Sequence, residues 1–170
     1  LSHATLHGSN QYAPGDGLVS LRQQVAELFL SRDHIQLDPI TEISITPGAT
    51  IGIFSTIQAL VNAGDEVIVF DPSYDSYAPS IELVGAKAVR IALQQPDFSV
   101  PWQQVKDAIT SKTRMIIVNT PHNPSGSMWS KQDWLNLIEL IQASNIVVLS
   151  DEVYEHLVYD GHRHFSALSF

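Results

Sequence analysis

The sequence predicts an α/β fold, with three αβα layers around a mostly parallel sheet. Short apolar runs alternate with amphipathic stretches, which is typical of strands joined by helices. The apolar runs are uniformly hydrophobic, as expected for strands that are covered on both faces of a sheet. Two of the runs are followed directly by polar clusters, at residues 119–126 and 150–154. Because ligands of open parallel sheets bind at the carboxyl ends of the strands, these clusters indicate a binding site.

The first half of the chain contains three predicted helices and three predicted strands. Apolar residues from 18 to 28 recur at helical spacing, and Asp16 is the expected N-cap of this helix. A short apolar strand ends at Pro47-Gly48, and Gly85 closes the third helix. The predicted helices cover residues 18–28, 51–61 and 77–84, and the predicted strands cover residues 43–45, 66–70 and 88–91.

The second half continues the alternation with two helices and two strands. Pro101 begins a short helix, and Ser130 is the expected cap of a longer one. The longer helix is expected to turn four residues inward: Trp134, Leu135, Ile138 and Ile141. The predicted helices cover residues 101–109 and 130–143, and the predicted strands cover residues 115–118 and 146–149.

Length and composition restrict the possible functions. A chain of 170 residues suits one domain. Nine Lys and Arg against 18 Asp and Glu give a net charge of −9, which argues against nucleic acid and anionic membranes as partners. There is no cysteine, so disulfides and thiolate metal sites are excluded. No apolar run reaches the roughly 20 residues of a membrane helix, and we expect a cytoplasmic protein. His162 and His164 lack a third ligand of clear spacing, so no metal site is predicted.

The residues after the predicted strands carry the chemistry. Asp151 follows an apolar strand, where its carboxylate would point into the crevice and could hold a proton on a heterocyclic nitrogen. Asn123 and Tyr154 offer N–H and O–H donors, and Tyr74 offers a ring that could stack on a flat heterocycle. Residues 48–50 lie where a helix begins, and backbone N–H groups there suit a phosphate.

Each of these residues has a plainer explanation when it is taken alone. Asp151 could be a turn or cap residue, and Asn123 could open a turn before its proline. Tyr154 and Tyr74 could simply pack against the sheet. The combination is therefore more informative than any one member.

Five motifs recur in the order of a known family. They are Gln-Tyr-Ala-Pro-Gly-Asp-Gly at 11–17, Thr-Pro-Gly-Ala-Thr at 46–50, Asp-Pro-Ser-Tyr at 71–74, Asn-Thr-Pro-His-Asn-Pro-Ser-Gly at 119–126 and Ser-Asp-Glu-Val-Tyr at 150–154. Together they resemble the class I/II aminotransferases, which are fold type I enzymes that use pyridoxal 5'-phosphate (PLP). Within that family, the chain looks most like the methionine and kynurenine (glutamine-type) enzymes.

The resemblance implies a role for each candidate residue. Asp151 and Tyr154 would be the catalytic residues of this chain, with Asp151 against the pyridine nitrogen. Asn123 and Tyr154 would hold the ring oxygen, and Tyr74 would stack on the ring. The phosphate would meet the backbone of Gly48, Ala49 and Thr50. Tyr12 would reach the phosphate of the neighbouring subunit in a homodimer, while Gly17 and Asn123 would border the substrate. The substrates would be an amino acid and a 2-oxo acid.

One expected element is missing from the chain. The family's Schiff-base lysine lies in a Ser-x-x-Lys motif, and no serine here precedes a lysine by three places. We therefore expect residues 1–17 to lead into the large domain and residues 18–170 to form part of it, without the lysine region and the C-terminal small domain. Such a chain would be inactive alone. The alternatives are a PLP-dependent carbon–sulfur β-lyase and a non-catalytic aminotransferase-like effector domain.

Overall fold

The computed structural model describes residues 2–8 and 10–170 and divides the chain into two compact units. The first unit spans Leu1–Pro47 and the second spans Gly48–Phe170. Leu1 and Ser9, which fall in the predicted segment 1–17, lie outside the described residues. Among the residues that the structure describes, no helix combines the length and apolar character needed to cross a membrane.

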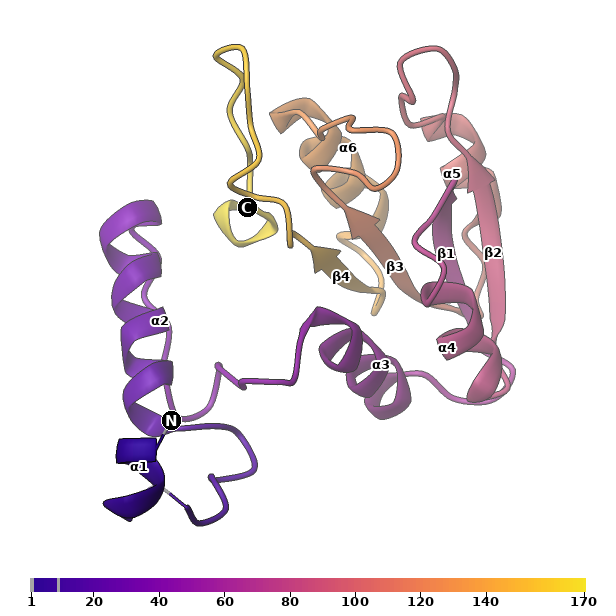
Figure 1. Cartoon of the computed structure of the whole chain (residues 1–170). Helices are drawn as coiled ribbons and strands as arrows, with labels where there is room; N and C mark the ends of the chain where they lie inside the picture. The colour runs from indigo at the N-terminus through magenta and orange to yellow at the C-terminus, as the bar shows by residue number, and fades with distance from the viewer. Residues whose placement is uncertain (1, 9) are drawn as a thin grey trace. The chain divides into compact units, whose positions relative to one another are not determined.

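The first unit contains two helices, α1 (Ser2–Leu6) and α2 (Val19–Asp33) (Figure 1). The predicted helix of residues 18–28 is confirmed as α2, whereas the opening that was expected to be irregular contains α1. Arg22 is buried in this unit, and its guanidinium donates to the carbonyl of Ile40 at 3.2 Å. This contact ties α2 to the segment that follows it.

Two predictions for the first unit are wrong. Residues 43–45 are not in a strand, and the N–H of Ile45 donates instead to the carbonyl of Asp16 at 2.9 Å. A short apolar run becomes a strand only when a neighbouring strand pairs with it, and the described residues of this unit contain none. Asp16 does not cap α2, whose N-cap is Leu18 without a side-chain hydrogen bond.

The second unit is built on a four-stranded parallel sheet. Its strands are β1 (Glu66–Asp71), β2 (Lys87–Ala92), β3 (Thr113–Asn119) and β4 (Val147–Asp151). They lie side by side in the order β2-β1-β3-β4, and every neighbouring pair is parallel (Figure 1). The predicted α/β class and parallel sheet are therefore confirmed.

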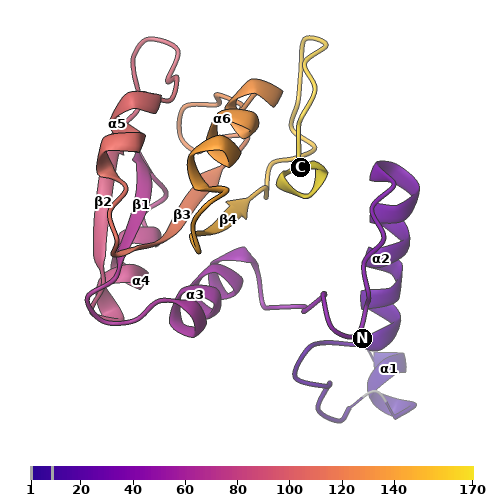
Figure 2. The same cartoon turned by 180° about the vertical axis from the view of Figure 1, so that it is seen from behind.

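Helices cover both faces of this sheet. One face carries α3 (Ala49–Leu60) and α4 (Tyr77–Leu83), and the other carries α5 (Trp102–Ala108) and α6 (Lys131–Ile141), as Figures 1 and 2 show together. Successive residues of a strand point to opposite faces, so Ile116 and Ile117 of β3 enter different cores. This alternation explains why the central residues of β1 and β3 are apolar on both faces of the sheet. A short 3₁₀ helix (Ala167–Ser169) follows at the end of the chain.

The predicted cap of α6 is confirmed, but the prediction that Leu135 faces inward is wrong. The hydroxyl of Ser130 accepts from the N–H of Asp133 at 3.2 Å, and the Asp133 carboxylate accepts from the Ser130 N–H at 2.8 Å. Trp134 and Leu137 are the buried residues of the helix, whereas Leu135 is exposed. Leu135 is one step from Trp134, which turns it about 100° away from the buried face.

Candidate active site

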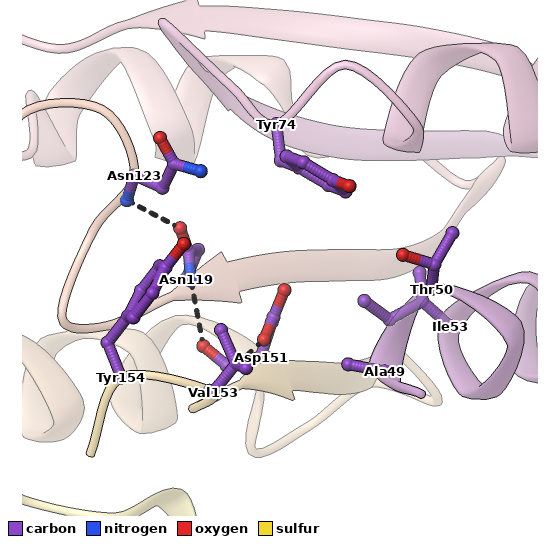
Figure 3. Close-up of a pocket in the computed structure, with 9 residues that line it drawn as sticks. All are labelled: Ala49, Thr50, Ile53, Tyr74, Asn119, Asn123, Asp151, Val153 and Tyr154. Carbon is purple, nitrogen blue, oxygen red and sulfur yellow. Dashed lines mark hydrogen bonds between the residues drawn. The ribbon is translucent and has the colours of Figure 1, made fainter. Parts of the chain in front are cut away.

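A pocket of about 220 Å³ lies at the carboxyl ends of the strands. The helix that follows β1 packs on one face of the sheet, and the helix that follows β3 packs on the other. The loops after these neighbouring strands therefore diverge, and such a switch point is where open α/β sheets bind ligands. Figure 3 shows the lining residues: Ala49, Thr50, Ile53, Tyr74, Asn119, Asn123, Asp151, Val153 and Tyr154.

Asp151 places a buried negative charge in the floor of this pocket. It is the last residue of β4 and is 9% exposed. Its Oδ2 accepts from the hydroxyl of Tyr77 at 2.6 Å, and its Oδ1 accepts from the N–H of Val153 at 3.3 Å. No ion pair joins Asp151 to a basic side chain within residues 2–8 and 10–170. A buried carboxylate without a cationic partner is costly, so the pocket favours a positively charged group.

Tyr77 and Tyr74 form an aromatic pair beside this carboxylate. Burial, and next the hydrogen bond to Asp151, raise the pKa of the Tyr77 hydroxyl above its ordinary value, so the phenol keeps its proton and donates. The two rings meet edge to face, with their centroids 5.7 Å apart. This packing holds the ring of Tyr74 at the pocket, where Figure 3 shows it above Asp151.

Asn119 joins the ends of two neighbouring strands. It lies opposite Asp151 in the register of β3 and β4. Its Nδ2 donates to the carbonyl of Asp151 at 3.0 Å, and its Oδ1 accepts from the N–H of Asn123 at 2.8 Å. One amide side chain therefore fixes Asn123 and Asp151 relative to each other.

The loop after β3 closes around His122, whose side chain is buried. The His122 Nδ1 lies 2.6 Å from the hydroxyl of Ser125, and its backbone carbonyl accepts from the N–H of Gly126 at 2.8 Å. Burial lowers the pKa of His122, which favours a neutral ring. The closed loop presents Asn123 to the pocket (Figure 3).

The N-terminus of α3 forms the other end of the pocket. Gly48 is its N-cap with φ 90°, a left-handed conformation that suits glycine. The first N–H groups of a helix, here those of Ala49 and Thr50, have no partner within the helix and can bind an anion. Asn123 and Tyr154 lie at the far end of the pocket from Thr50 (Figure 3).

The structure brings together most of the predicted site residues. Six of them line the pocket: Ala49, Thr50, Tyr74, Asn123, Asp151 and Tyr154. Gly48 directly precedes Ala49 in the chain, whereas Tyr12 and Gly17 belong to the first unit. The roles of all nine residues stay predictions. The sequence analysis did not assign a role to Asn119, which begins the motif at 119–126, or to Tyr77, which lies three residues after the motif at 71–74. The signal for Asn119 was its position as the final residue of an apolar strand.

Two polar groups outside the pocket have partners of their own. Asp71, at the end of β1, forms an ion pair with Arg90 at 3.2 Å. His162 is exposed, and His164 hydrogen-bonds through Nε2 to Glu152 at 2.8 Å. Glu152 also accepts from the N–H of Ala167, so this contact holds the chain after β4 in place.

Comparison with known proteins shows the family to which the chain belongs. The model of the family described as aminotransferase class I and II matches residues 2–170. The chain belongs to the class I and II aminotransferases. This aminotransferase chain is 45% identical to a methionine aminotransferase of Escherichia coli over 169 residues, which are 99% of this chain and 44% of that protein. It is 37% identical to human kynurenine–oxoglutarate transaminase 3 over 177 residues, with 98% of this chain and 39% of that protein covered.

Solved aminotransferase structures share the fold. An E. coli structure described as having a methionine aminotransferase function matches with a TM-score of 0.95 over 99% of this chain and 44% of that one. N-succinyldiaminopimelate aminotransferase from Mycobacterium tuberculosis matches with a TM-score of 0.94 at 38% identity, over 99% of this chain and 44% of that one. The chain thus spans less than half the length of these relatives.

Proposed function

We propose that this chain forms the cofactor-binding part of a PLP-dependent aminotransferase, which moves an amino group from an amino acid to a 2-oxo acid. The observation that carries the proposal is the pocket at the switch point of the sheet. There, a buried carboxylate, an aromatic ring, a helix N-terminus and two side-chain donors surround one volume. Relatives named as aminotransferases support the reaction class. None of the proteins named above favours the β-lyase or the effector domain.

The donor set fits PLP from end to end. The cofactor has a basic ring nitrogen, a ring oxygen and a phosphate, and it supplies the electron sink for chemistry at the amino-acid Cα. Asp151 would hold the proton on the ring nitrogen, because no basic side chain of the described residues forms an ion pair with its carboxylate. The face of Tyr74 would pack on the ring.

The two ends of the pocket would orient the cofactor. Asn123 and Tyr154 would donate to the ring oxygen through an amide N–H and a phenol O–H. The backbone N–H groups that follow Gly48 would bind the phosphate, with the positive end of the α3 dipole behind them. Asn123 would also border the substrate, and Gly17 keeps the substrate role that the family resemblance implies.

No lysine of this chain lines the pocket. The four lysines, all among the described residues, are Lys87, Lys106, Lys112 and Lys131. We therefore propose that PLP binds this chain weakly and without a covalent bond. Borohydride treatment with PLP, followed by peptide mass mapping, checks this. A stoichiometric phosphopyridoxyl adduct on one of these lysines would contradict it.

The site is proposed to be completed by a second subunit in a cytoplasmic homodimer. Tyr12 would reach the phosphate of the neighbouring subunit. In the active enzyme that contains this chain, a Tyr12→Phe protein and an Asp151→Ala protein should each be inactive. Mixing them should restore some activity, because one hybrid site is complete. No recovery despite proven subunit exchange would argue for a self-contained site.

The cofactor proposal is tested by binding. PLP or pyridoxamine 5'-phosphate titrated into the chain should quench tyrosine and tryptophan fluorescence in a saturable way. Asp151→Asn should weaken binding by at least about ten-fold, since a hydrogen bond to a charged group contributes roughly 1.5–3 kcal/mol. Asp97→Asn changes an exposed carboxylate in the same way and should leave the affinity unchanged. Equal affinities for both variants would refute the role of Asp151.

A further inference from the structure

Tyr77 makes the shortest contact to Asp151, although it does not line the pocket. It is the first residue of α4, is 3% exposed and lies 74 positions before Asp151 in the chain. Its hydroxyl is 2.6 Å from Oδ2 of Asp151, whereas the N–H of Val153 is 3.3 Å from Oδ1. The orientation of the carboxylate therefore depends mainly on Tyr77.

The direction of this hydrogen bond is fixed. Burial and the neighbouring carboxylate both raise the pKa of Tyr77, so the phenol remains protonated and Asp151 accepts. The other titratable groups that act on Tyr77 are Tyr74 and Tyr154, and both are phenols. The described residues bring no basic side chain into contact with Asp151, so neutral donors alone offset its charge.

We propose that Tyr77 is a positioning residue that aims the Asp151 carboxylate and stabilises its negative charge, so that the shared proton stays on the cofactor's ring nitrogen. This inference rests on the proposed function. When a carboxylate and a heterocyclic nitrogen share one proton, a third group that donates to the carboxylate favours the ion pair over the neutral pair. Tyr77 would thus act through Asp151 without touching the cofactor.

The experiment uses the whole 170-residue chain and ¹⁵N-labelled pyridoxamine 5'-phosphate, a ligand that needs no Schiff-base lysine. In the unchanged chain at pH 7, the ¹⁵N chemical shift of the ring should be that of a protonated nitrogen. Tyr77→Phe should move it toward the unprotonated value and weaken binding by about ten-fold. Tyr159→Phe removes the same hydroxyl from an exposed tyrosine and should change neither quantity.

A double-mutant cycle separates this role from a merely structural one. In an Asp151→Asn background, the loss of affinity caused by Tyr77→Phe should disappear, because Tyr77 acts through that carboxylate. The inference would be overturned if the affinity losses of Tyr77→Phe and Asp151→Asn simply add. It would also be overturned if the ring ¹⁵N chemical shift is identical in the Tyr77→Phe chain and the unchanged chain. If Tyr77→Phe fails to fold, 3-fluorotyrosine at position 77 keeps the shape with a stronger donor. Its effect must likewise vanish with Asp151→Asn, and an effect that persists overturns the inference.

The outcomes distinguish this inference from the proposed function. An unchanged chain that fails to bind pyridoxamine 5'-phosphate at millimolar concentration would overturn the proposed function. A chain that binds it, with Tyr77→Phe equally tight and equally protonated, would overturn only the role of Tyr77.

Discussion

Replacing Asn119 with alanine should destabilise the second unit and loosen the pocket. The side chain makes two hydrogen bonds at the ends of neighbouring strands, to the N–H of Asn123 and the carbonyl of Asp151. The Asp151 carbonyl also accepts from the N–H of Thr120 at 3.1 Å, so it keeps a partner, and the loss there is about 1 kcal/mol. The Asn123 N–H donates to Asn119, and the loss of this hydrogen bond costs about 1–2 kcal/mol because the site is only partly buried. The expected total is about 2–3 kcal/mol.

Urea unfolding followed by tryptophan fluorescence measures this loss. All three tryptophans lie in the second unit, and the ring of Trp129 contacts those of Trp102 and Trp134, so their emission reports that unit. Asn136→Ala is the matched control, because Asn136 accepts an exposed side-chain hydrogen bond from Gln132 and its replacement should cost less than about 0.5 kcal/mol. If Asn119→Ala has the same urea midpoint and denaturant slope as the control, Asn119 does not stabilise the unit by joining Asn123 to Asp151.

Three further predictions concern stability. Because burial lowers the pKa of His122, the unfolded chain binds the extra proton, and the unfolding free energy should fall between pH 7.5 and 5.5 by at most about 1.4 kcal/mol per pH unit. The lowered pKa values of Asp38 and Glu66 change the unfolding free energy only at lower pH. The pH dependence of the unfolding free energy should therefore vanish in His122→Asn but persist in His162→Asn. Ser130→Ala should cost about 1 kcal/mol in the same urea assay by removing the α6 cap, and no change would show that Asp133 alone suffices. Gly17→Ala should destabilise the first unit by about 2–4 kcal/mol, because φ is +92° and the new Cβ would lie 2.6 Å from Ile45 Cβ. Circular dichroism should detect that loss while tryptophan fluorescence stays constant.

The sequence was sufficient for elements whose signals are local. Short, mainly apolar runs predicted all four strands of the second unit, and Ser130 marked the start of α6. Residues 43–45 have the same apolar character, yet pairing decides whether such a run is a strand, and pairing is not a local property. Asp16 does not cap α2 because the helix begins at Val19, which makes Leu18 its N-cap.

The candidate site was predictable where residues follow strands and hidden where contacts are distant. Asn123, Asp151 and Tyr154 stand within five residues of the ends of apolar runs, so the parallel sheet delivers them to one edge. The hydrogen bond from Tyr77 to Asp151 joins two elements with no shared sequence pattern. Only the packing of α4 against the sheet brings them together.

The strand order has a consequence for motion. β4 pairs only with β3 among the described residues, whereas β3 lies between two neighbours. Edge strands open at a smaller free-energy cost than central ones. Within this chain taken alone, Asp151 therefore stands on the more labile strand, and the loop bearing Asn123 leaves the more rigid one. A ligand that contacts both must restrain β4 as it binds, so part of its affinity is spent on reduced fluctuation of that strand. Adding the ligand should slow amide exchange by a larger factor at residues 147–151 than in β3, which would make that restraint visible.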